Sequence, residues 1–314
     1  MREVLPLLIG GLVLFLYAIS QLSEILKELF SEKVRETIKK YTANIFLSIL
    51  IGTVLTIILN SSSAVIILVI VFINSKNLDF KQAVGLIMGA NIGTTFSSQV
   101  IALNVGEFSA IPLLIGLTFV IFLKHKTWKL YGKALLYFGM LFFGLYLVET
   151  SVLPLKDSEL FTDWITRIED NPWQGALIGG LITLIIQSSS GTVGIAILLQ
   201  KQQLLSVAGG VAMMLGAELG TCSDTLIATI NGSRAAIKAG VFHLSFNLMT
   251  ITIGLLLFTP FLRLVEQISA AEEIGNAIAN AHVIFNLLGV VIFLPFVPLL
   301  VKLFDWLIPE KTTA

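Results

Sequence analysis

Two serine triplets interrupt stretches of chain that are otherwise apolar enough to be membrane helices. Residues 60–63 (Asn-Ser-Ser-Ser) lie within the apolar run of about 43–73, and residues 187–190 (Gln-Ser-Ser-Ser) lie within the run of about 172–199. A bilayer core offers no water to hydrogen-bond the backbone, so irregular backbone survives there only inside protein or beside a water-lined cavity. Each polar break must therefore face other protein or a cavity.

A second signature follows each triplet, Gly-Ala-Asn-Ile-Gly-Thr at 89–94 and Gly-Ala-Glu-Leu-Gly-Thr at 216–221. Both signatures recur at one displacement of 127 positions. An ungapped alignment of 52–98 on 179–225 gives 13 identities in 47, and seven of them fall within the signatures. Chance similarity between apolar segments would place identities at Leu, Ile and Val, whereas these gather at Ser, Gly and Thr. The pattern predicts a duplicated polar site.

The composition indicates a membrane protein. Hydrophobic residues make up 56% of the chain and charged residues 13%, whereas soluble domains carry about 25% charged residues. Several segments reach the roughly 20 apolar residues that a spanning helix needs. We therefore expect an all-α polytopic protein of the cell (inner) membrane. The net charge of zero gives no reason to expect a nucleic-acid partner, and the single Cys222 excludes an intramolecular disulfide.

The half-segments on either side of each triplet are too short to cross about 30 Å of hydrocarbon at about 1.5 Å per residue. Two short halves that meet at a polar turn predict a re-entrant helical hairpin. Loop charge tests this topology, because cytoplasmic loops are rich in Lys and Arg. With the N-terminus outside, the basic loops at 23–40, 76–81, 124–129 and 234–238 fall inside, and only Lys201 is misplaced.

The same assignment makes the first hairpin enter from inside and the second from outside, which is an inverted-topology repeat. We expect repeat 1 at 1–127 and repeat 2 at 128–260. An extra transmembrane helix at 277–304 would leave the C-terminus in the cytoplasm. The alternating charges of 23–40 are typical of an interfacial helix, and the acidic stretches 149–171 and 259–276 are expected to be outside loops.

The residue types of the two signatures suit an anion accompanied by cations. Helix N-termini present N–H groups and partial positive charge, whereas hydroxyl and amide side chains both donate and accept hydrogen bonds. Glycine allows close backbone approach, and threonine hydroxyls offer oxygen to a hard cation. Neither motif contains Arg or Lys, so co-bound cations would balance a bound anion and couple the two.

These signatures resemble those of the type II sodium/phosphate cotransporter family, bacterial branch. Similar features are Asn171-Pro172 before the second hairpin, the segment 11–17 in the first helix, and the 279–286 segment with His282 and Asn286. The resemblance covers roughly 10–296. It implies two inverted repeats, phosphate held between the hairpin tips, and Na⁺ bound at the tips and the Gly-Thr signatures. That branch often carries a C-terminal regulatory domain, which we do not expect here.

Carried over residue by residue, the resemblance gives two sets of expected ligands. Expected phosphate contacts are Asn60, Ser61, Ser62, Ser63, Gln187, Ser188, Ser189 and Ser190. Expected sodium ligands are Gln187, Ser188, Thr221, Asp224, Asn91, Thr94, Ser97 and Glu218. No catalytic residue and no organic cofactor is expected.

Three positions depart from the family pattern. Asn60 stands where Gln is usual, Glu218 where Asn is usual, and Asp224 where Thr is usual. Carboxylates within a membrane are functional candidates by default, and here they disfavour an anion unless cations or protons neutralise them. We expect Asp224 to bind a cation and Glu218 to add a cation or to titrate.

Other interpretations stay open at this point. The departures allow a proton- or sodium-coupled carrier of another small anion, and broken hairpins are compatible with a channel. An intramembrane serine hydrolase would need an activated serine, and this sequence contains no Gly-x-Ser-x-Gly elbow. The i,i+4 pairs His243/Asn247 and His282/Asn286 predict either helix–helix hydrogen bonding or a proton relay. The sequence leaves a homodimer open.

Overall fold

The computed structural model describes residues 4–29, 41–103, 109–152, 159–230, 232–270 and 276–309. Every regular element within these residues is helical. The elements are α1 (Val4–Leu29), α3 (Ile45–Leu59), α4 (Ser62–Asn74), α5 (Phe80–Ala102), α6 (Ala110–Phe122), α7 (Lys126–Val152), α8 (Glu159–Asp170), α9 (Pro172–Ile186), α10 (Ser189–Lys201), α11 (Val207–Gly220), α12 (Cys222–Ala228), α13 (Arg234–Leu256), α14 (Phe258–Ser269), α15 (Asn276–Phe293), a 3₁₀ turn (Leu294–Phe296) and α16 (Val297–Leu307).

The pairs α3–α4 and α9–α10 have the same bounds at a displacement of 127 residues: 45 becomes 172, 59 becomes 186, 62 becomes 189 and 74 becomes 201. The local sequence explains where α3 and α9 begin. The side chains of Asn44 and Asn171 cap α3 and α9 by accepting hydrogen bonds from first-turn amides, as short polar residues do at helix starts. Pro172 follows at the first helical position of α9, where its missing N–H costs nothing.

Each pair is broken by one residue in the left-handed backbone region, Asn60 with φ 49° and Gln187 with φ 54°. An extended serine follows, with φ −158° at Ser61 and −151° at Ser188. Left-handed backbone ends an α-helix, and an extended residue with a side-chain acceptor starts the next one. The amide-then-serine order thus breaks both apolar runs at the same place.

The glycines of the second signature let helices touch backbone to backbone. A Cβ on Gly89 would lie 2.0 Å from the Ile49 carbonyl oxygen, and one on Gly216 would lie 1.7 Å from that of Ala176. The close approach expected of these glycines therefore serves the α3–α5 and α9–α11 packing. It fixes each Gly-Thr signature against the first half of its own broken pair.

Within the described residues, five segments are long and apolar enough to cross a membrane, so the chain is a polytopic helical membrane protein. They are Val4–Leu22, Lys126–Ser151, Val207–Ala228, Arg234–Leu256 and Asn276–Leu307. Shorter apolar helices are Ile45–Leu59, Ser62–Asn74, Ala110–Phe122 and Pro172–Ile186. The α3–α4 and α9 halves thus have the short lengths anticipated from the sequence.

Some expected boundaries differ from those of the structure. The acidic stretches expected as loops contain the amphipathic helices α8 and α14. The last expected helix ends at Phe293 and restarts as α16, because Pro295 and Pro298 lack the N–H that a continuous helix needs. Of the expected 23–40 helix, α1 supplies the part up to Leu29, and 30–40 lies outside the described residues.

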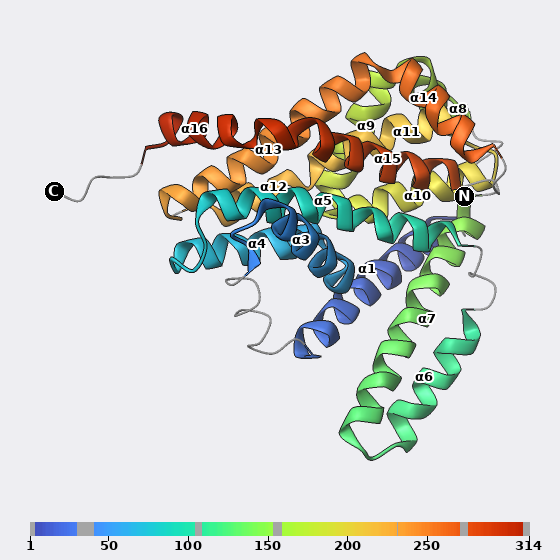
Figure 1. The fold of residues 1–314 in the computed structure, drawn as a ribbon. Helices are drawn as coiled ribbons and strands as arrows, with labels where there is room; N and C mark the ends of the chain where they lie inside the picture. Colours follow the sequence, from blue (N-terminus) through green and yellow to red (C-terminus); the bar gives the residue numbers. More distant parts are fainter. Residues whose placement is uncertain are drawn as a thin grey trace.

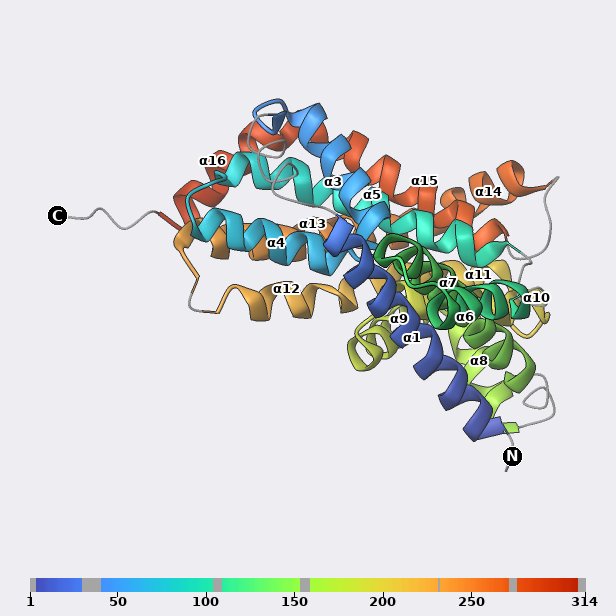
Figure 2. The same cartoon turned by 90° about the horizontal axis from the view of Figure 1, so that it is seen from below.

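The helices form a main body and a projecting arm (Figure 1). The arm is the antiparallel pair α6–α7, and α1 packs on α7 as well as α3. Figure 2 shows α1 crossing the region where α3 turns into α4, with α4 lying beside α12, which it contacts. Helices α5, α11, α13 and α15 pack together in the body. This crossing brings α1 against one serine break.

Candidate functional site

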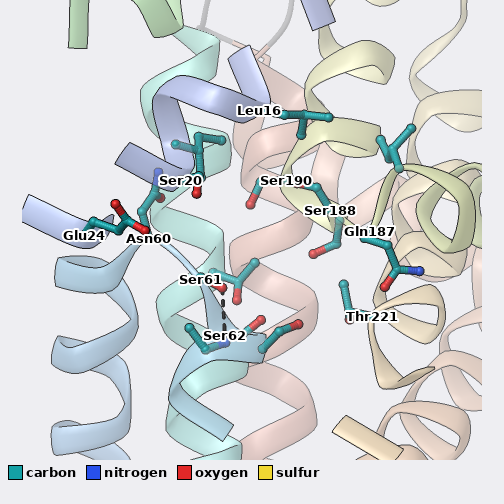
Figure 3. Close-up of a pocket in the computed structure, with 16 residues that line it drawn as sticks. Leu16, Ser20, Glu24, Asn60, Ser61, Ser62, Gln187, Ser188, Ser190 and Thr221 are labelled. Atoms are coloured by element: carbon teal, nitrogen blue, oxygen red, sulfur yellow. Dashed lines mark hydrogen bonds between the residues drawn. The ribbon is translucent and has the colours of Figure 1, made fainter. Parts of the chain in front are cut away.

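Both serine-containing turns line one cavity of about 320 Å³ (Figure 3). The eight expected phosphate contacts all belong to its lining: Asn60, Ser61, Ser62, Ser63, Gln187, Ser188, Ser189 and Ser190. Two segments that are 127 residues apart in sequence therefore meet at one polar space. Its volume is that of a small-ligand site.

Two helix N-termini meet this cavity. The Ser61 hydroxyl oxygen accepts a hydrogen bond from the Ala64 amide at 3.1 Å, and that of Ser188 accepts one from the Gly191 amide at 3.1 Å. The caps fix the first turns of α4 and α10, whose earliest amides have no partner within the helix. Those amides and the helix dipoles make each N-terminus a favourable place for an anion.

The amide side chains at the breaks have different partners. The Ser97 hydroxyl of α5 donates to the Asn60 side-chain oxygen. By contrast, the Gln187 side-chain nitrogen donates to the Leu184 carbonyl of its own helix. The Asn60 side chain is thus tied to a neighbouring helix, whereas the Gln187 side chain is tied only to α9.

The expected sodium ligands divide into two groups. Gln187, Ser188, Thr94 and Thr221 line the cavity. The two threonine hydroxyls donate to carbonyls of their own helices, Thr94 to Ala90 at 3.0 Å and Thr221 to Glu218 at 3.1 Å. Their oxygen lone pairs remain able to accept or to coordinate a cation.

The remaining expected sodium ligands lie apart from the described lining of this cavity. Ser97 lines a neighbouring cavity of about 310 Å³, to which Asn60 and Ile19 also belong. The Asp224 carboxylate accepts a hydrogen bond from the Ser223 hydroxyl at 3.3 Å. Asn91 and Glu218 are buried in a polar network between helices.

That network joins four helices. The Glu218 carboxylate lies 2.7 Å from His282 Nε2, and His282 Nδ1 lies 2.7 Å from the Ser98 hydroxyl. Asn247 accepts from the Asn91 side chain and donates to the Glu218 carbonyl at 3.0 Å. His282 and Asn247 thus make the helix–helix hydrogen bonds anticipated for the His–Asn pairs, whereas Asn286 donates to the His282 carbonyl of its own helix.

Helix α1 contributes residues that the sequence interpretation missed. Leu16, Ser20 and Glu24 line the cavity and follow one another at four-residue spacing, which places them on one helix face. The sequence pattern groups Glu24 with the alternating charges of 23–40. The four-residue spacing of Leu16, Ser20 and Glu24 could have identified them, because it places all three on one face of an apolar helix. Among the described lining residues, Glu24 is the only one with an ionisable side chain.

A polar cavity between two broken helix pairs of a helical membrane protein is the arrangement that many membrane transporters use. The chain matches the model of the Na⁺/Pi-cotransporter family over residues 14–150 and 154–291. It therefore belongs to that family, and the resemblance found in the sequence is confirmed. The serine hydrolase alternative falls with this assignment.

Three similar proteins illustrate the range of relatives. The chain is 30% identical over 308 residues to the uncharacterized protein YqeW of Bacillus subtilis, covering 97% of this chain and 99% of that protein. It is 23% identical over 270 residues to the putative inorganic phosphate export protein YjbB of Escherichia coli, covering 85% of this chain and 49% of that protein. It is 31% identical over 149 residues to the human sodium-dependent phosphate transport protein 2B, covering 44% of this chain and 22% of that protein. No solved structure matches the chain.

Proposed function

We propose that the chain is a sodium-coupled secondary transporter of inorganic phosphate, with phosphate held between the two serine-containing turns. The observation that carries the proposal is the convergence of two capped helix N-termini on one cavity. First-turn amides and serine hydroxyls donate hydrogen bonds, and phosphate oxygens accept them. The family, and relatives named for phosphate export and sodium-dependent phosphate transport, support the same substrate.

In the proposed arrangement, α3–α4 and α9–α10 are re-entrant hairpins of opposite orientation in two inverted repeats. The lengths support this, because the 15 residues of α3 and the 13 of α4 span only about 22 and 20 Å at 1.5 Å per residue. A hydrocarbon core is about 30 Å thick. Transport would proceed by alternating access, with the paired hairpins moving against the other helices.

The charge of the site supports the proposed sodium coupling. Phosphate carries negative charge, and the described lining has no Lys, Arg or His to balance it. Hydroxyl and carbonyl oxygens suit hard cations such as Na⁺. We assign the cation to the side of the cavity formed by Gln187, Ser188 and Thr221, with Thr94 as the corresponding position of the first unit. A cation bound there lowers the energy of the bound anion and so links the two solutes.

A proton-coupled carrier is the second candidate. The observation that favours it is the Glu218 carboxylate, which is buried against His282, because such pairs form proton relays in many membrane transporters. In that case uptake would follow a pH gradient and would not require Na⁺.

Uptake of labelled phosphate into proteoliposomes tests the proposal. With an imposed inward Na⁺ gradient we expect accumulation, and with K⁺ in place of Na⁺ we expect none. Ser61→Ala and Ser188→Ala should each lower uptake at least about tenfold, since each removes a cap and a donor. Uptake that continues at the normal rate in both variants would contradict the site.

The matched control is Ser75→Ala, at the other end of α4 and away from the cavity. It should transport like the unmodified protein. Size-exclusion profiles in detergent establish that all variants are folded. Sodium-independent uptake that follows a pH gradient would favour the second candidate.

A further inference from the structure

Helix α1 forms one wall of the cavity and contributes Glu24, which is the only ionisable side chain among the described lining residues. Figure 3 shows the Glu24 carboxylate beside Asn60, with Ser20 one helical turn away and Gln187 and Ser188 across the cavity. Glu24 is exposed and belongs to the lining of the cavity. A carboxylate repels an anion, so its presence in the lining of an anion site needs an explanation.

The other polar side chains in the described lining are uncharged, so none of them repels an oxyanion that lacks a proton. Serine hydroxyls and helix amides donate to phosphate and sulfate oxygens alike. An ionised carboxylate only accepts hydrogen bonds. It therefore repels an oxyanion without a proton and binds one that presents an O–H group.

We propose that Glu24 is a specificity-determining residue, which accepts a hydrogen bond from the P–OH group of phosphate and rejects sulfate. Inorganic phosphate retains at least one proton at neutral pH, whereas sulfate retains none. The inference rests on the proposed function and states how that site recognises its substrate. The donors of the two serine turns bind the unprotonated oxygens of phosphate, and Glu24 accepts a hydrogen bond from the protonated oxygen.

The expected effect follows from the loss of one matched donor–acceptor pair. Sites that hydrogen-bond a substrate O–H reject analogues lacking it by roughly 10⁴–10⁵-fold when the polar groups are buried. Glu24 is exposed, so water weakens both the bond and the repulsion. We expect discrimination between phosphate and sulfate to depend on Glu24 by at least about tenfold.

Competition in proteoliposomes measures this selectivity. Uptake of labelled phosphate is recorded under a fixed Na⁺ gradient with unlabelled phosphate, arsenate or sulfate as competitor. For the unmodified protein, arsenate, which also retains a proton, should compete, and sulfate should not. For Glu24→Gln, whose amide can donate to sulfate, the ratio of the sulfate to the phosphate inhibition constant should fall at least about tenfold.

Two further variants sharpen the result. Glu24→Asp keeps a carboxylate and should keep most of the discrimination. Glu266→Gln removes an exposed carboxylate from α14, away from the cavity, and should change nothing. Detergent-purified protein gives a second measurement, in which sulfate displaces bound labelled phosphate from Glu24→Gln but not from the unmodified protein.

The outcomes separate this inference from the proposed function. An unchanged sulfate-to-phosphate ratio in Glu24→Gln overturns the inference, whether uptake falls or only its Na⁺ dependence shifts. Sulfate competition equal to that of phosphate in the unmodified protein also overturns it and leaves phosphate transport standing. No phosphate uptake by the unmodified protein would overturn the proposed function itself.

Discussion

The two serine-containing units share one local frame but differ in what surrounds it. In both, an asparagine-capped helix ends at a left-handed residue, and a serine-capped helix begins after it. The amide side chain at the break bonds to another helix in the first unit and to its own helix in the second. Local sequence therefore sets the break, and the neighbouring helix sets how firmly its side chain is held.

The two units also differ at the Ser97 position, because the residue 127 positions after Ser97 is Asp224. The Ser97 hydroxyl donates to the Asn60 side chain, whereas the Asp224 carboxylate accepts from the Ser223 hydroxyl at 3.3 Å. The Gln187 side chain bonds instead to the Leu184 carbonyl. The first unit has a tie between α3 and α5 at the place where the second unit has a carboxylate.

The corresponding positions Asn91 and Glu218 meet at a common partner. Asn247 of α13 bonds to the side chain of the first and to the backbone carbonyl of the second. The extra carboxylate of the second unit then reaches His282 on α15. The two units are thus joined through Asn247 of α13 and through His282 of α15, which also bonds the Ser98 hydroxyl of the first unit.

The largest expected effect is that of Gly216→Ala, which tests whether close packing holds both units. The new Cβ would lie 1.7 Å from the Ala176 carbonyl oxygen, and overpacking of this kind costs about 3 kcal/mol or more. We expect loss of the folded protein or a much lower thermal transition in detergent. Gly10→Ala, where a Cβ meets nothing within 4 Å, is the control. Normal stability of Gly216→Ala would show that α9 and α11 are not fixed as described.

The next effect concerns the carboxylate that distinguishes the second unit. Glu218→Ala leaves the buried His282 Nε2 without this partner, which costs about 1–3 kcal/mol. Glu218→Gln keeps a hydrogen-bonding side chain and should cost less. Thermal unfolding in detergent compares the two. Equal stability of Glu218→Ala and the unmodified protein would mean that the contact to α15 contributes nothing.

A smaller effect is expected for Asn60→Gln, which gives the first unit the residue of the second. The longer side chain displaces the oxygen that Ser97 bonds, and one hydrogen bond contributes about 1 kcal/mol. Asparagine is also better suited to left-handed backbone. We expect a small loss in thermal stability, measured beside Ser97→Ala. If both single variants and the double variant lose the same amount, the bond accounts for the whole effect.

The smallest effect is expected for the reverse exchange, Gln187→Asn. It loses a bond within one exposed turn and gains a residue that favours the left-handed region. The two contributions offset each other, so stability should change by less than about 0.5 kcal/mol. A loss as large as that of Asn60→Gln would remove the asymmetry between the two units.

The sequence was sufficient for the features that depend on neighbouring residues. Serine and asparagine at the breaks and caps act within three residues, and the displacement of 127 residues relates the two units through the order of their amino acids alone. The membrane setting followed from composition. That both tetrapeptides share one site was inferred from the duplication and not from local sequence. In the structure both of them line one cavity.

Other features depend on contacts between distant segments. Glu218 and His282 are 64 residues apart, and Ser98 and His282 are 184 apart, so no local pattern pairs them. The sequence places Glu24 in a charged interfacial helix because the alternating charges after it dominate the pattern. Only the crossing of α1 over the α3–α4 turn brings it to the cavity.

The serine caps have one further consequence for the energetics of capture. Because the Ala64 and Gly191 amides hold the Ser61 and Ser188 oxygens, the two turns are preorganised before a solute arrives. Little protein conformational entropy then remains to be lost on binding, and preorganisation of this kind raises affinity without any additional contact. In the proposed mechanism, a cavity that keeps its shape would bind and release phosphate at each cycle without refolding of the two turns.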